Sequence, residues 1–455
     1  KNIRYLRTGT ADGEVTITKT DREKAEVLNS YFAGVFTDED PHGVPAAEDR
    51  SGGRELTEVH ITRQHIIDKI DKLKVDKSPG LDGVHPRVLK ELKNELCEPL
   101  YIIFLNSVEQ GKLPDEWKAA NITALYKKED KTSPGNYRPI SLTSILCKLL
   151  ESILCDHIVG YMKSNKLFDN NQYGFLKGRS TTMLLLKVMD EWTKILDEGD
   201  SVNVIYTDFS KAFDTVPHGR LISKLSGYGI RGKMLTWIGE FLKDRKQRVV
   251  VQGEASSWEW VKSGVPQGSV LGPILFLIYI NDITEGIKSE AYLFADDMKL
   301  FSRVVDIHSS MVLQNDLDTV MRWTKKWLLS LNIGKCKVLA MGKGAGSFDY
   351  EVDIVSGRVR LERSALERDL GVQVDSELTF QEHIWGKVKT ANKMVGLIRR
   401  NFGEAGAHSL MLIYKAMGKT ASRVRPGRLE PVQGETGGGT GESSEACNQA
   451  DPRMW

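Results

Sequence analysis

The stretch VNVIYTDFSKAFDTVPH (202–218) decides the fold, together with two later stretches, GVPQGSVLGPILFLIYIND (264–282) and YLFADDMKLF (292–301). The first is rich in β-forming residues up to Asp208, which indicates a strand that ends on a carboxylate. The second opens with a Gly/Pro-rich turn and continues as an apolar helix, with Pro273 at an acceptable first-turn position. The third predicts two short strands hinged at Ala295, Asp296 and Asp297.

The acidic residues of the first and third stretches carry the chemistry. Apolar residues flank Asp296 and Asp297 on both sides, so these carboxylates are expected at the edge of a core, where they repel each other unless a cation relieves them. Phosphoryl transfer uses such a pair, because two Mg²⁺ ions about 4 Å apart activate the nucleophile and neutralise the leaving phosphates. The alternatives are a solvated turn at 295–297 and a simple strand cap at Asp208.

Composition sets broad limits on the class of protein. The 455 residues are 40% hydrophobic and carry 63 Lys+Arg against 61 Asp+Glu, which suits a folded chain and implies no partner through net charge. The five cysteines are scattered, which argues against a disulfide framework or a structural zinc site. The longest apolar run, 270–280, is too short to span a membrane and contains Gly272 and Pro273. We expect an intracellular protein of the nucleus or cytoplasm, and Lys1 suggests a fragment.

Hydrophobic periodicity predicts a series of further elements. Helices are expected over 21–36, 86–110, 144–165, 180–198, 273–281 and 311–331, and strands over 121–128, 201–209 and 336–342, with a hairpin-like alternation over 248–262. The polar, Gly-rich stretch 38–54 is interpreted as a linker.

The C-terminal part differs in composition. Between 387 and 428 there are ten Lys/Arg (387, 389, 393, 399, 400, 415, 419, 423, 425 and 428) and one acid, Glu404. Beyond Thr420 the sequence is Gly/Ser/Glu-rich with few aliphatic residues, which predicts disorder.

The ordered blocks resemble a known family. The sequence is similar to the reverse transcriptase of non-LTR (LINE-type) retrotransposons, closest in kind to the Jockey/chicken-repeat group, over roughly residues 60–415. The similarity extends beyond the three stretches quoted first. It also covers KSPGLDGVHP (77–86), NITALYKK (121–128), NYRPISLTSILCKLLE (136–151), NQYGFLKGRSTT (171–182), WLLSLNIGKCKVLAMG (327–342) and DLGVQVDSELTFQEHI (369–384).

The resemblance implies an α+β right-hand polymerase whose palm is a split βαβ sheet. The implied organisation is an N-terminal segment and linker (1–60), fingers (61–200), palm (201–345), palm end and basic helical thumb (346–419), and a disordered tail unlike the family (420–455). A frameshift or read-through would produce such a tail. The endonuclease that accompanies complete family members is absent from this sequence.

The resemblance also implies the roles of individual site residues. Asp208 and Asp296 would be the main Mg²⁺ ligands, with Mn²⁺ an alternative ion, Asp297 the neighbouring acid and the carbonyl of Phe209 an extra ligand. Lys335 would protonate the departing pyrophosphate, although Lys337 is close by in the sequence.

The remaining implied residues would bind the nucleotide. Phe213 matches the bulky residue that excludes a 2′-hydroxyl, and its alternative is a core aromatic. Gln267 and Gly268 match a turn beside the nucleotide, or form a helix-capping turn. Arg138 matches the arginine that grips the triphosphate, which suits a bidentate guanidinium. Lys127 or Lys128 would be a second cation, and the sequence does not choose between them.

The implied function is RNA-directed DNA synthesis from dNTPs on an RNA template and a DNA primer, with the basic region holding the duplex. Two alternatives stay open: an RNA-dependent RNA polymerase, and a catalytically inactive nucleic-acid-binding remnant. The oligomeric state is not predicted.

Overall fold

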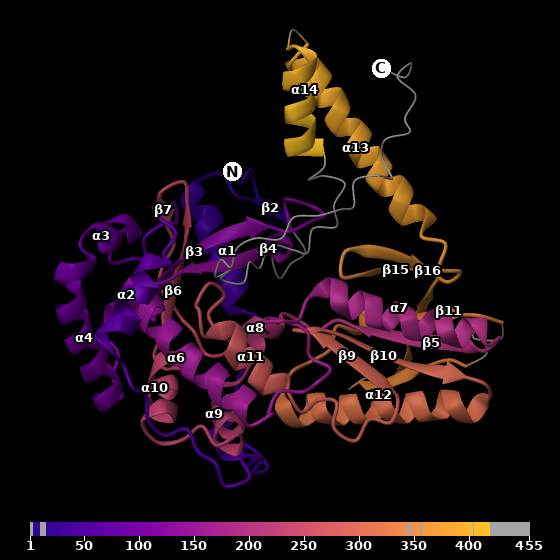
Figure 1. The fold of residues 1–455 in the computed structure, drawn as a ribbon, viewed down its shortest axis with the longest axis horizontal. Helices are drawn as coiled ribbons and strands as arrows, with labels where there is room; N and C mark the ends of the chain where they lie inside the picture. The colour runs from indigo at the N-terminus through magenta and orange to yellow at the C-terminus, as the bar shows by residue number, and fades with distance from the viewer. Residues whose placement is uncertain are drawn as a thin grey trace. The chain divides into compact units, whose positions relative to one another are not determined.

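A computed structural model describes residues 3–9, 15–343, 346, 348–354, 357–403 and 405–418. Internal contacts divide the chain into two units, Lys1–Lys389 and Thr390–Trp455, and each is described by itself. The tail predicted to be disordered, 420–455, lies outside the described residues. The mixture of helices and strands agrees with the predicted α+β class (Figure 1).

One sheet carries the predicted acids, and we call it the carboxylate sheet. Its strand order is β14-β11-β5-β10-β9. The strands are β5 (Ser201–Thr207), β9 (Glu290–Phe294), β10 (Asp297–Val304), β11 (Lys337–Met341) and β14 (Glu362–Ser364). The pairings are antiparallel except that between β11 and β14. The strands predicted over 201–209, 292–301 and 336–342 are therefore confirmed.

Helices cover both faces of the carboxylate sheet (Figure 1). Alternate strand residues, such as Val204 and Phe301, pack with Trp192 of α7 (Thr181–Asp197). Their sequence neighbours, such as Ile205 and Leu300, belong to the larger core that contains α12 (Ile307–Trp327). This period of two is what a sheet buried on both faces requires.

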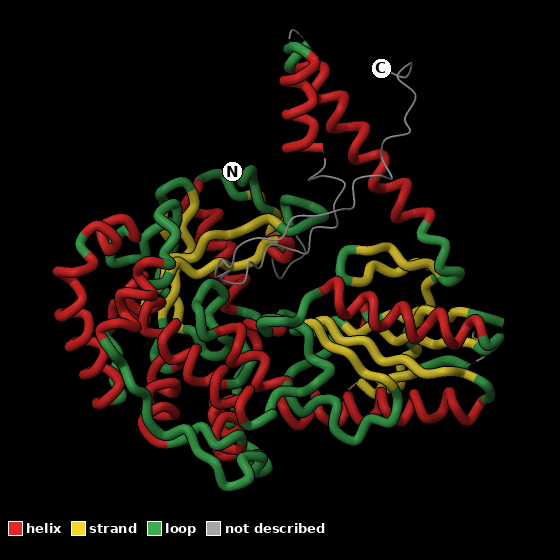
Figure 2. The backbone as a smooth tube through the Cα atoms, in the orientation of Figure 1, coloured by secondary structure: helices red, strands yellow, loops and turns green. Residues whose placement is uncertain are grey.

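A second sheet has the order β4-β3-β6-β7, with β8 also paired to β6. Figure 2 draws strands in yellow in the orientation of Figure 1, where β3, β4, β6 and β7 are labelled. Its strands are β3 (Ala119–Tyr126), β4 (Tyr137–Leu142), β6 (Lys246–Val251), β7 (Glu254–Ala255) and β8 (Glu259–Trp260). Leu28 and Phe32 of α1 (Asp21–Ala33) pack with Ile122 and Val249 of this sheet. The N-terminal residues are thus part of the folded unit.

The other helices enclose the larger core. They are α2 (Arg63–Asp71), α3 (Pro86–Glu91), α4 (Lys93–Gln110), α5 (Asp115–Lys118), α6 (Ile145–Ser164), α8 (Ala212–Thr215), α9 (His218–Gly227), α10 (Gly232–Leu242) and α11 (Gly272–Ile280). Helix α11 is buried along almost its whole circumference, as its apolar sequence predicts.

Two predicted helices have different bounds in the structure. The single helix predicted over 86–110 is wrong, because Leu92 (φ −106°, ψ 28°) separates α3 from α4. The helix predicted over 311–331 begins earlier and ends earlier. Its capping box at Asp306 and Ser309 sets the start, and Leu328 adopts a left-handed conformation (φ 54°) just after its end.

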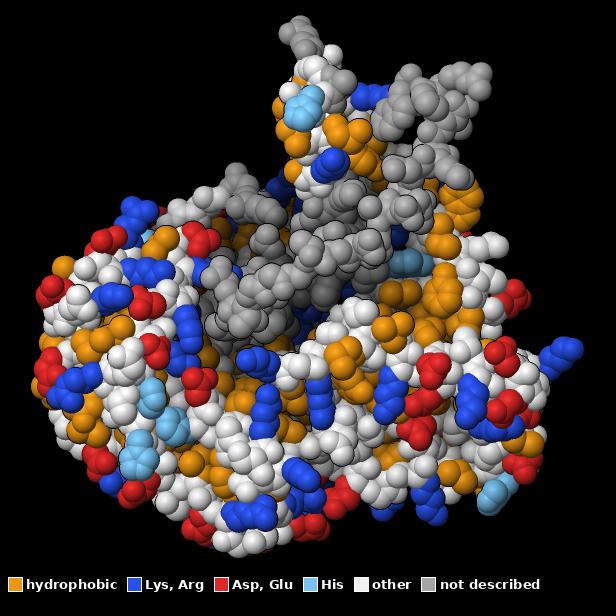
Figure 3. All heavy atoms as spheres, viewed as in Figure 1, with side chains coloured by type: hydrophobic (Ala, Val, Ile, Leu, Met, Phe, Trp, Pro, Cys, Tyr) orange, Lys and Arg blue, Asp and Glu red, His pale blue; other side chains and the backbone are white. Residues whose placement is uncertain are grey.

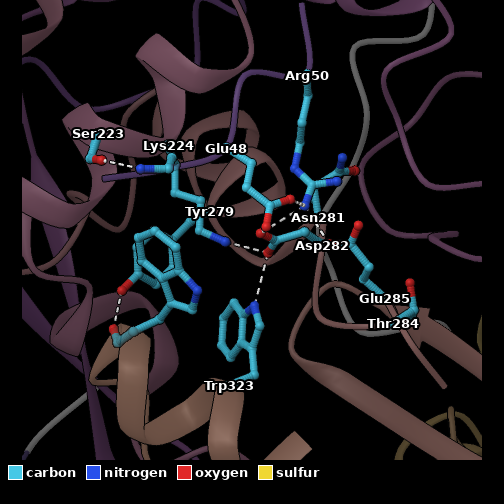
Figure 4. A network of polar contacts seen from close by, with 12 residues as sticks. Glu48, Arg50, Ser223, Lys224, Tyr279, Asn281, Asp282, Thr284, Glu285 and Trp323 are labelled. Atoms are coloured by element: carbon cyan, nitrogen blue, oxygen red, sulfur yellow. Dashed lines mark hydrogen bonds and ion pairs between the residues drawn. The ribbon is translucent and has the colours of Figure 1, made fainter. Parts of the chain in front are cut away.

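The linker predicted over 38–54 is wrong, because this segment packs along α9. Glu39 forms an ion pair with the buried Arg220, and Arg50 pairs with Glu285 beside Asp282. Figure 4 shows this second network, in which Asp282 also accepts hydrogen bonds from Lys224 and Trp323. Polar, Gly-rich composition indicated irregular backbone, and that backbone is held by the largely buried Glu39–Arg220 pair and the more exposed Arg50–Glu285 pair.

Other described elements are three two-stranded sheets and the C-terminal helices. In the first unit, β1 (Arg7–Gly9) pairs with β2 (Val15–Ile17), β12 (Glu351–Ile354) with β13 (Gly357–Arg360), and β15 (Leu366–Asp369) with β16 (Val372–Asp375). Helix α13 (Gln381–Asn401) runs across the unit boundary and is followed by α14 (Ala407–Ile413) and a π-helical turn, Tyr414–Gly418.

The described surface carries charges of both signs. Lys/Arg and Asp/Glu side chains are interspersed over the face in Figure 3, which fits the near-neutral net charge. No helix among the described residues has both the length and the apolar character to cross a membrane.

Candidate active site

Two carboxylates meet at the ends of the central strands of the carboxylate sheet. Thr207, the last residue of β5, pairs with Met298 of β10. The same antiparallel register, continued by one residue, sets Asp208 opposite Asp297. Directly opposed side chains share one face of a sheet, with Cβ atoms roughly 4.5–5.5 Å apart. Acids that are distant in the sequence are therefore neighbours in space.

Asp296 lies beside this pair in the turn between β9 and β10. Phe294 pairs with Asp297, so Ala295 and Asp296 form a two-residue hairpin loop. Ala295 has φ 59°, a left-handed conformation that costs a non-glycine residue about 1–2 kcal/mol. The loop needs external support to hold this conformation.

The buried side chain of Gln172 provides that support. Its Oε1 accepts hydrogen bonds from the backbone N–H of Ala295 (2.8 Å) and of Gly174 (2.7 Å), and its Nε2 donates to the Ala295 carbonyl (3.4 Å). The backbone of 171–173 also bonds to Leu293 on both sides. A Cβ at Gly174 would lie 2.4 Å from the Ala295 nitrogen, so only glycine permits this approach.

Burial and neighbouring carboxylates raise the pKa of Asp296 and of Asp297. Removal from water raises the pKa of Asp296, and the charge of Asp208 raises it further. The pKa of Asp297 is raised to about 7, first by desolvation and then by the charges of Asp296 and Asp208, although the residue borders solvent. The site therefore concentrates negative charge that a cation would relieve.

One cation contacts an acid of the site directly, and a second acts on another acid only through its charge. The Nζ of Lys335 lies 3.3 Å from Oδ2 of Asp208, and both side chains are partly exposed. Lys337 pairs instead with Glu362, beside β11, so of the two candidate lysines only Lys335 contacts an acid of the site. Lys299 is buried and forms an ion pair with Asp369. Its charge opposes the rise in the pKa of Asp297.

Phe209 follows Asp208 in an isolated β-bridge with Leu331. The bridge uses the carbonyl of Asp208, which accepts from Asn332 N–H (2.7 Å), and the N–H of Ser210, which donates to the Ser330 carbonyl (2.9 Å). The carbonyl of Phe209 takes no part in the bridge. The bridge therefore fixes the backbone on both sides of Phe209.

The cations predicted to bind the triphosphate lie in two different environments. Lys127 follows β3, and its pKa is lowered first by desolvation and then by the charges of Arg138 and Lys335, while Asp208 raises it. Arg138 lies on β4, opposite Leu125, and its charge lowers the pKa of Asp296. Lys128 pairs with its neighbour Glu129 at 3.2 Å. Lys127 and Arg138 thus lie within the electrostatic range of the acids.

The turn 263–268 brings Gln267 and Gly268 to the second sheet. The carbonyl of Gln267 accepts from Ser141 N–H at 2.7 Å. Gly268 has φ 117°, and a Cβ there would lie 2.5 Å from the Ser141 carbonyl oxygen. Glycine at this position is a requirement of the close approach.

Phe213 lies between this turn and α11. Its ring stacks on Phe276 (centroids 4.4 Å apart, 22° between planes) and meets Phe175 edge-on at 6.1 Å. The core-aromatic alternative is therefore present in the structure. The side chain is only partly buried, so it is also available at the edge of the core.

Three residues near the site had no assigned role from the sequence. Gln172 lies in the NQYGF block, two residues before Gly174, and this block contributed only to the family resemblance. Asp214 follows Phe213, and its Oδ1 accepts from Gln267 Nε2 at 2.8 Å. Lys299 sits two residues after Asp297 on a strand, and that spacing places both on the same face.

The donor set has the chemistry of a hard-cation site. Carboxylate oxygens of Asp208 and Asp296 are the ligands that Mg²⁺ prefers, and their mutual repulsion is the cost that a divalent ion offsets. Among the described residues, no three His, Cys, Asp or Glu side chains are close enough together to hold a metal ion. An ion here would need further oxygen ligands, such as water or the phosphates of a bound nucleotide.

Comparisons with known proteins agree with this geometry. Residues 126–374, more than half of the chain, match the family described as reverse transcriptase (RNA-dependent DNA polymerase). The matched region contains both strands that carry the acids.

Three of the curated relatives come from mobile elements of Drosophila. The chain is 29% identical over 341 residues to the "Probable RNA-directed DNA polymerase from transposon BS" of Drosophila melanogaster, covering 70% of this chain and 36% of that protein. It is 28% identical over 382 residues to the "RNA-directed DNA polymerase from mobile element jockey" of Drosophila funebris, covering 80% and 41%. It is 27% identical over 391 residues to the "Putative 115 kDa protein in type-1 retrotransposable element R1DM" of Drosophila melanogaster, covering 83% and 35%.

The chain thus spans 35–41% of the length of these three relatives. The predicted resemblance to non-LTR retrotransposon enzymes of the jockey type is confirmed. On the match across residues 126–374, the chain belongs to the reverse transcriptase (RNA-dependent DNA polymerase) family.

Proposed function

We propose that this chain is an RNA-directed DNA polymerase of a non-LTR retrotransposon. It adds deoxynucleoside monophosphates to the 3′-hydroxyl of a primer and releases pyrophosphate. The single observation that supports this most directly is the convergence of Asp208, Asp296 and Asp297 at adjoining strand ends, with Lys335 on Asp208. The relatives' printed names point to the same reaction.

Two Mg²⁺ ions, or Mn²⁺ in their place, are the proposed cofactors. Asp208 and Asp296 would hold them, with Asp297 and the carbonyl of Phe209 as additional oxygen donors. When bound, such ions neutralise charge on the nucleotide's phosphates and lower the pKa of the attacking hydroxyl. The raised pKa values of Asp296 and Asp297 fit a site that is built to receive positive charge.

Side chains of this protein would donate the proton and bind the nucleotide. Lys335 would donate a proton to the leaving pyrophosphate. Arg138 and Lys127 would bind the triphosphate, since both are coupled electrostatically to the acids, whereas Lys128 is paired with Glu129. Phe213 would close the space beside the sugar and so exclude a 2′-hydroxyl. Gln267 and Gly268 would border the nucleotide.

We propose the right-hand organisation for this fold. The carboxylate sheet would be the palm (201–345), with fingers over 61–200 and the palm end and thumb over 346–419. The shared second sheet, in which β3 pairs with β6, would join fingers to palm. Cations on α13 and after α14, namely Lys387, Lys389, Lys393, Arg399, Arg400 and Lys415, would bind the phosphates of a duplex.

The proposed partners are an RNA template, a DNA primer and dNTPs. Synthesis primed from chromosomal DNA would occur in the nucleus, and the compartment stays a prediction. The proposed disorder of 420–455 is likewise a prediction.

Primer extension tests the proposal. Wild-type protein is given a DNA primer on an RNA template with Mg²⁺ and dNTPs, and extension is expected. Asp208→Asn should lower the extension rate at least about 100-fold. Mutation of residues that only hydrogen-bond to metal ligands typically lowers metal affinity or activity 10–100-fold, and loss of a ligand itself should have a larger effect. The matched control is Asp200→Asn, which changes an acid just before the other end of β5 and should leave the rate within about twofold.

The same assay separates the alternatives. Preference for NTPs over dNTPs would favour an RNA polymerase and contradict the proposal. Salt-sensitive binding of primer–template with no extension, unchanged in Asp296→Asn, would identify an inactive nucleic-acid-binding remnant.

A further inference from the structure

Asp214 has no role in the chemistry described so far. It lies in α8, directly after Phe213, and its half-buried side chain turns toward the 263–268 turn. The backbone carbonyl of Asp214 accepts from Ser263 Oγ at 2.8 Å. A Cβ at Gly264 would lie 2.7 Å from the same carbonyl oxygen, so α8 and the turn are packed backbone to backbone.

Further hydrogen bonds fix the turn to α8 and to β4. Gly264 N–H donates to the Val216 carbonyl and Val265 N–H to the Phe213 carbonyl, both at 2.8 Å. On the other side, the Gln267 carbonyl accepts from Ser141 N–H at 2.7 Å. These bonds hold the backbone of Gln267 but leave its side-chain amide free to rotate.

The carboxylate of Asp214 determines that rotation. Gln267 Nε2 donates to Asp214 Oδ1 at 2.8 Å. An ionised carboxylate only accepts hydrogen bonds, so it holds the NH₂ end of the amide and turns the carbonyl end away. Burial raises the pKa of Asp214 to about 6, while the hydrogen bond from Gln267 and the charges of Lys211 and Arg138 oppose the rise.

A small cavity borders this pair. It has a volume of about 30 Å³ and is lined by Ser141, Asp214, Gln247 and Gln267, among others, so water has room beside the pair. Gln267 is partly exposed and Gly268 is exposed, so the turn reaches the surface directly after Gln267.

We infer that Asp214 is a positioning residue that fixes the amide orientation of Gln267 and thereby sets how this turn receives a deoxynucleoside triphosphate. With one N–H committed to Asp214, Gln267 offers the nucleotide its carbonyl oxygen and one remaining N–H. Asp214 also adjoins Phe213, so one short helix supports both residues proposed to face the sugar. The inference rests on the proposed function.

Steady-state extension with Asp214→Ala tests the inference. We expect the KM for dNTP to rise about tenfold, equivalent to about 1.4 kcal/mol, with a smaller change in kcat. Asp214→Asn should restore part of the loss, because its carbonyl oxygen can still accept from Gln267. A matched control exists on α2, where Gln64 Nε2 donates to Asp68 Oδ1 at 2.7 Å on the surface. Asp68→Ala should leave KM unchanged.

A double-mutant cycle decides whether Asp214 acts through Gln267. In a Gln267→Ala background, Asp214→Ala should cause little further change in KM. Equal effects of Asp214→Ala in both backgrounds, or a wild-type KM in Asp214→Ala, would overturn the inference while leaving the polymerase proposal intact.

Binding of a fluorescent dATP analogue in Ca²⁺ provides a readout that needs no turnover. Weaker binding by Asp214→Ala, with the Asn variant intermediate, supports the inference even where extension is absent and the polymerase proposal fails. Equal binding by all variants overturns it. A wild-type chain that neither extends a primer nor binds the analogue overturns both.

Discussion

Replacing Gln172 with leucine should destabilise the protein through one identifiable contact. The Oε1 of Gln172 accepts from two backbone N–H groups, those of Ala295 and Gly174, in a position that is 2% exposed. Leucine has a similar volume but no acceptor, so both N–H groups lose their partner. Each buried unsatisfied N–H costs about 1–3 kcal/mol, so the expected loss is about 2–6 kcal/mol.

The loss of stability in Gln172→Leu should be concentrated at the hairpin that carries Asp296. Ala295 holds a left-handed conformation, and Gln172 bonds to both its N–H and its carbonyl. Without these bonds the turn is expected to relax, and the carboxylate of Asp296 should shift with it. A displacement near 1 Å at a reacting group can cost about 100-fold in rate, so extension activity should fall steeply as well.

Equilibrium urea unfolding measures the first effect, and hydrogen exchange of peptides covering 290–300 locates it. Gln64→Leu is the matched control, because Gln64 is exposed on α2, and its change should stay within about 0.5 kcal/mol. A Gln172→Leu variant whose stability lies within about 1 kcal/mol of wild type, with unchanged exchange over the hairpin, would refute the reasoning.

Three further perturbations test other parts of the structure. Gly268→Ala should lower the free energy of unfolding by about 1–3 kcal/mol, and Gly253→Ala should lower it less. Both glycines have positive φ, but only a Cβ at 268 meets a backbone atom. Equal losses of the two variants in urea unfolding would contradict this. Lys224→Met should lower the free energy of unfolding by about 3–5 kcal/mol, because it leaves Asp282 without its buried partner. Adding Asp282→Asn should recover part of this stability. No recovery in the double variant would exclude the ion pair as the cause. Burial lowers the pKa of His218 below its usual 6.5, so the unfolded chain binds more protons than the folded one. The free energy of unfolding should therefore fall as the pH drops below about 6.5. His218→Gln should show a shallower fall with pH, and parallel curves would count against His218 as the cause.

The sequence by itself determined the local elements of the site. Richness in β-forming residues predicted β5, the apolar residues around Asp296 and Asp297 predicted the hairpin of β9 and β10, and the apolar run after Gly272 predicted α11. The paired acids in a hydrophobic hairpin indicated a charged site at the edge of a core. These features are local, because strand and helix periods are set by neighbouring residues.

Several features depended on contacts between distant segments. The polar stretch 38–54 has no hydrophobic period, yet Glu39 holds it to α9 through an ion pair with Arg220, and Arg50 pairs with Glu285. These partners are distant in the sequence, so a local pattern does not include them. Periodicity also continued across Leu92, but the backbone breaks the helix there.

Tertiary structure also decided how the site residues are arranged. It brought Asp208 close enough to Asp297 to raise the pKa of Asp297, and it brought Lys335 rather than Lys337 to Asp208. It also placed Gln172 under the Ala295 turn and Asp214 on Gln267. Sequence specifies which side chains are available, whereas strand register and the packing of distant loops specify the distances between them, and electrostatics and hydrogen bonds depend on those distances.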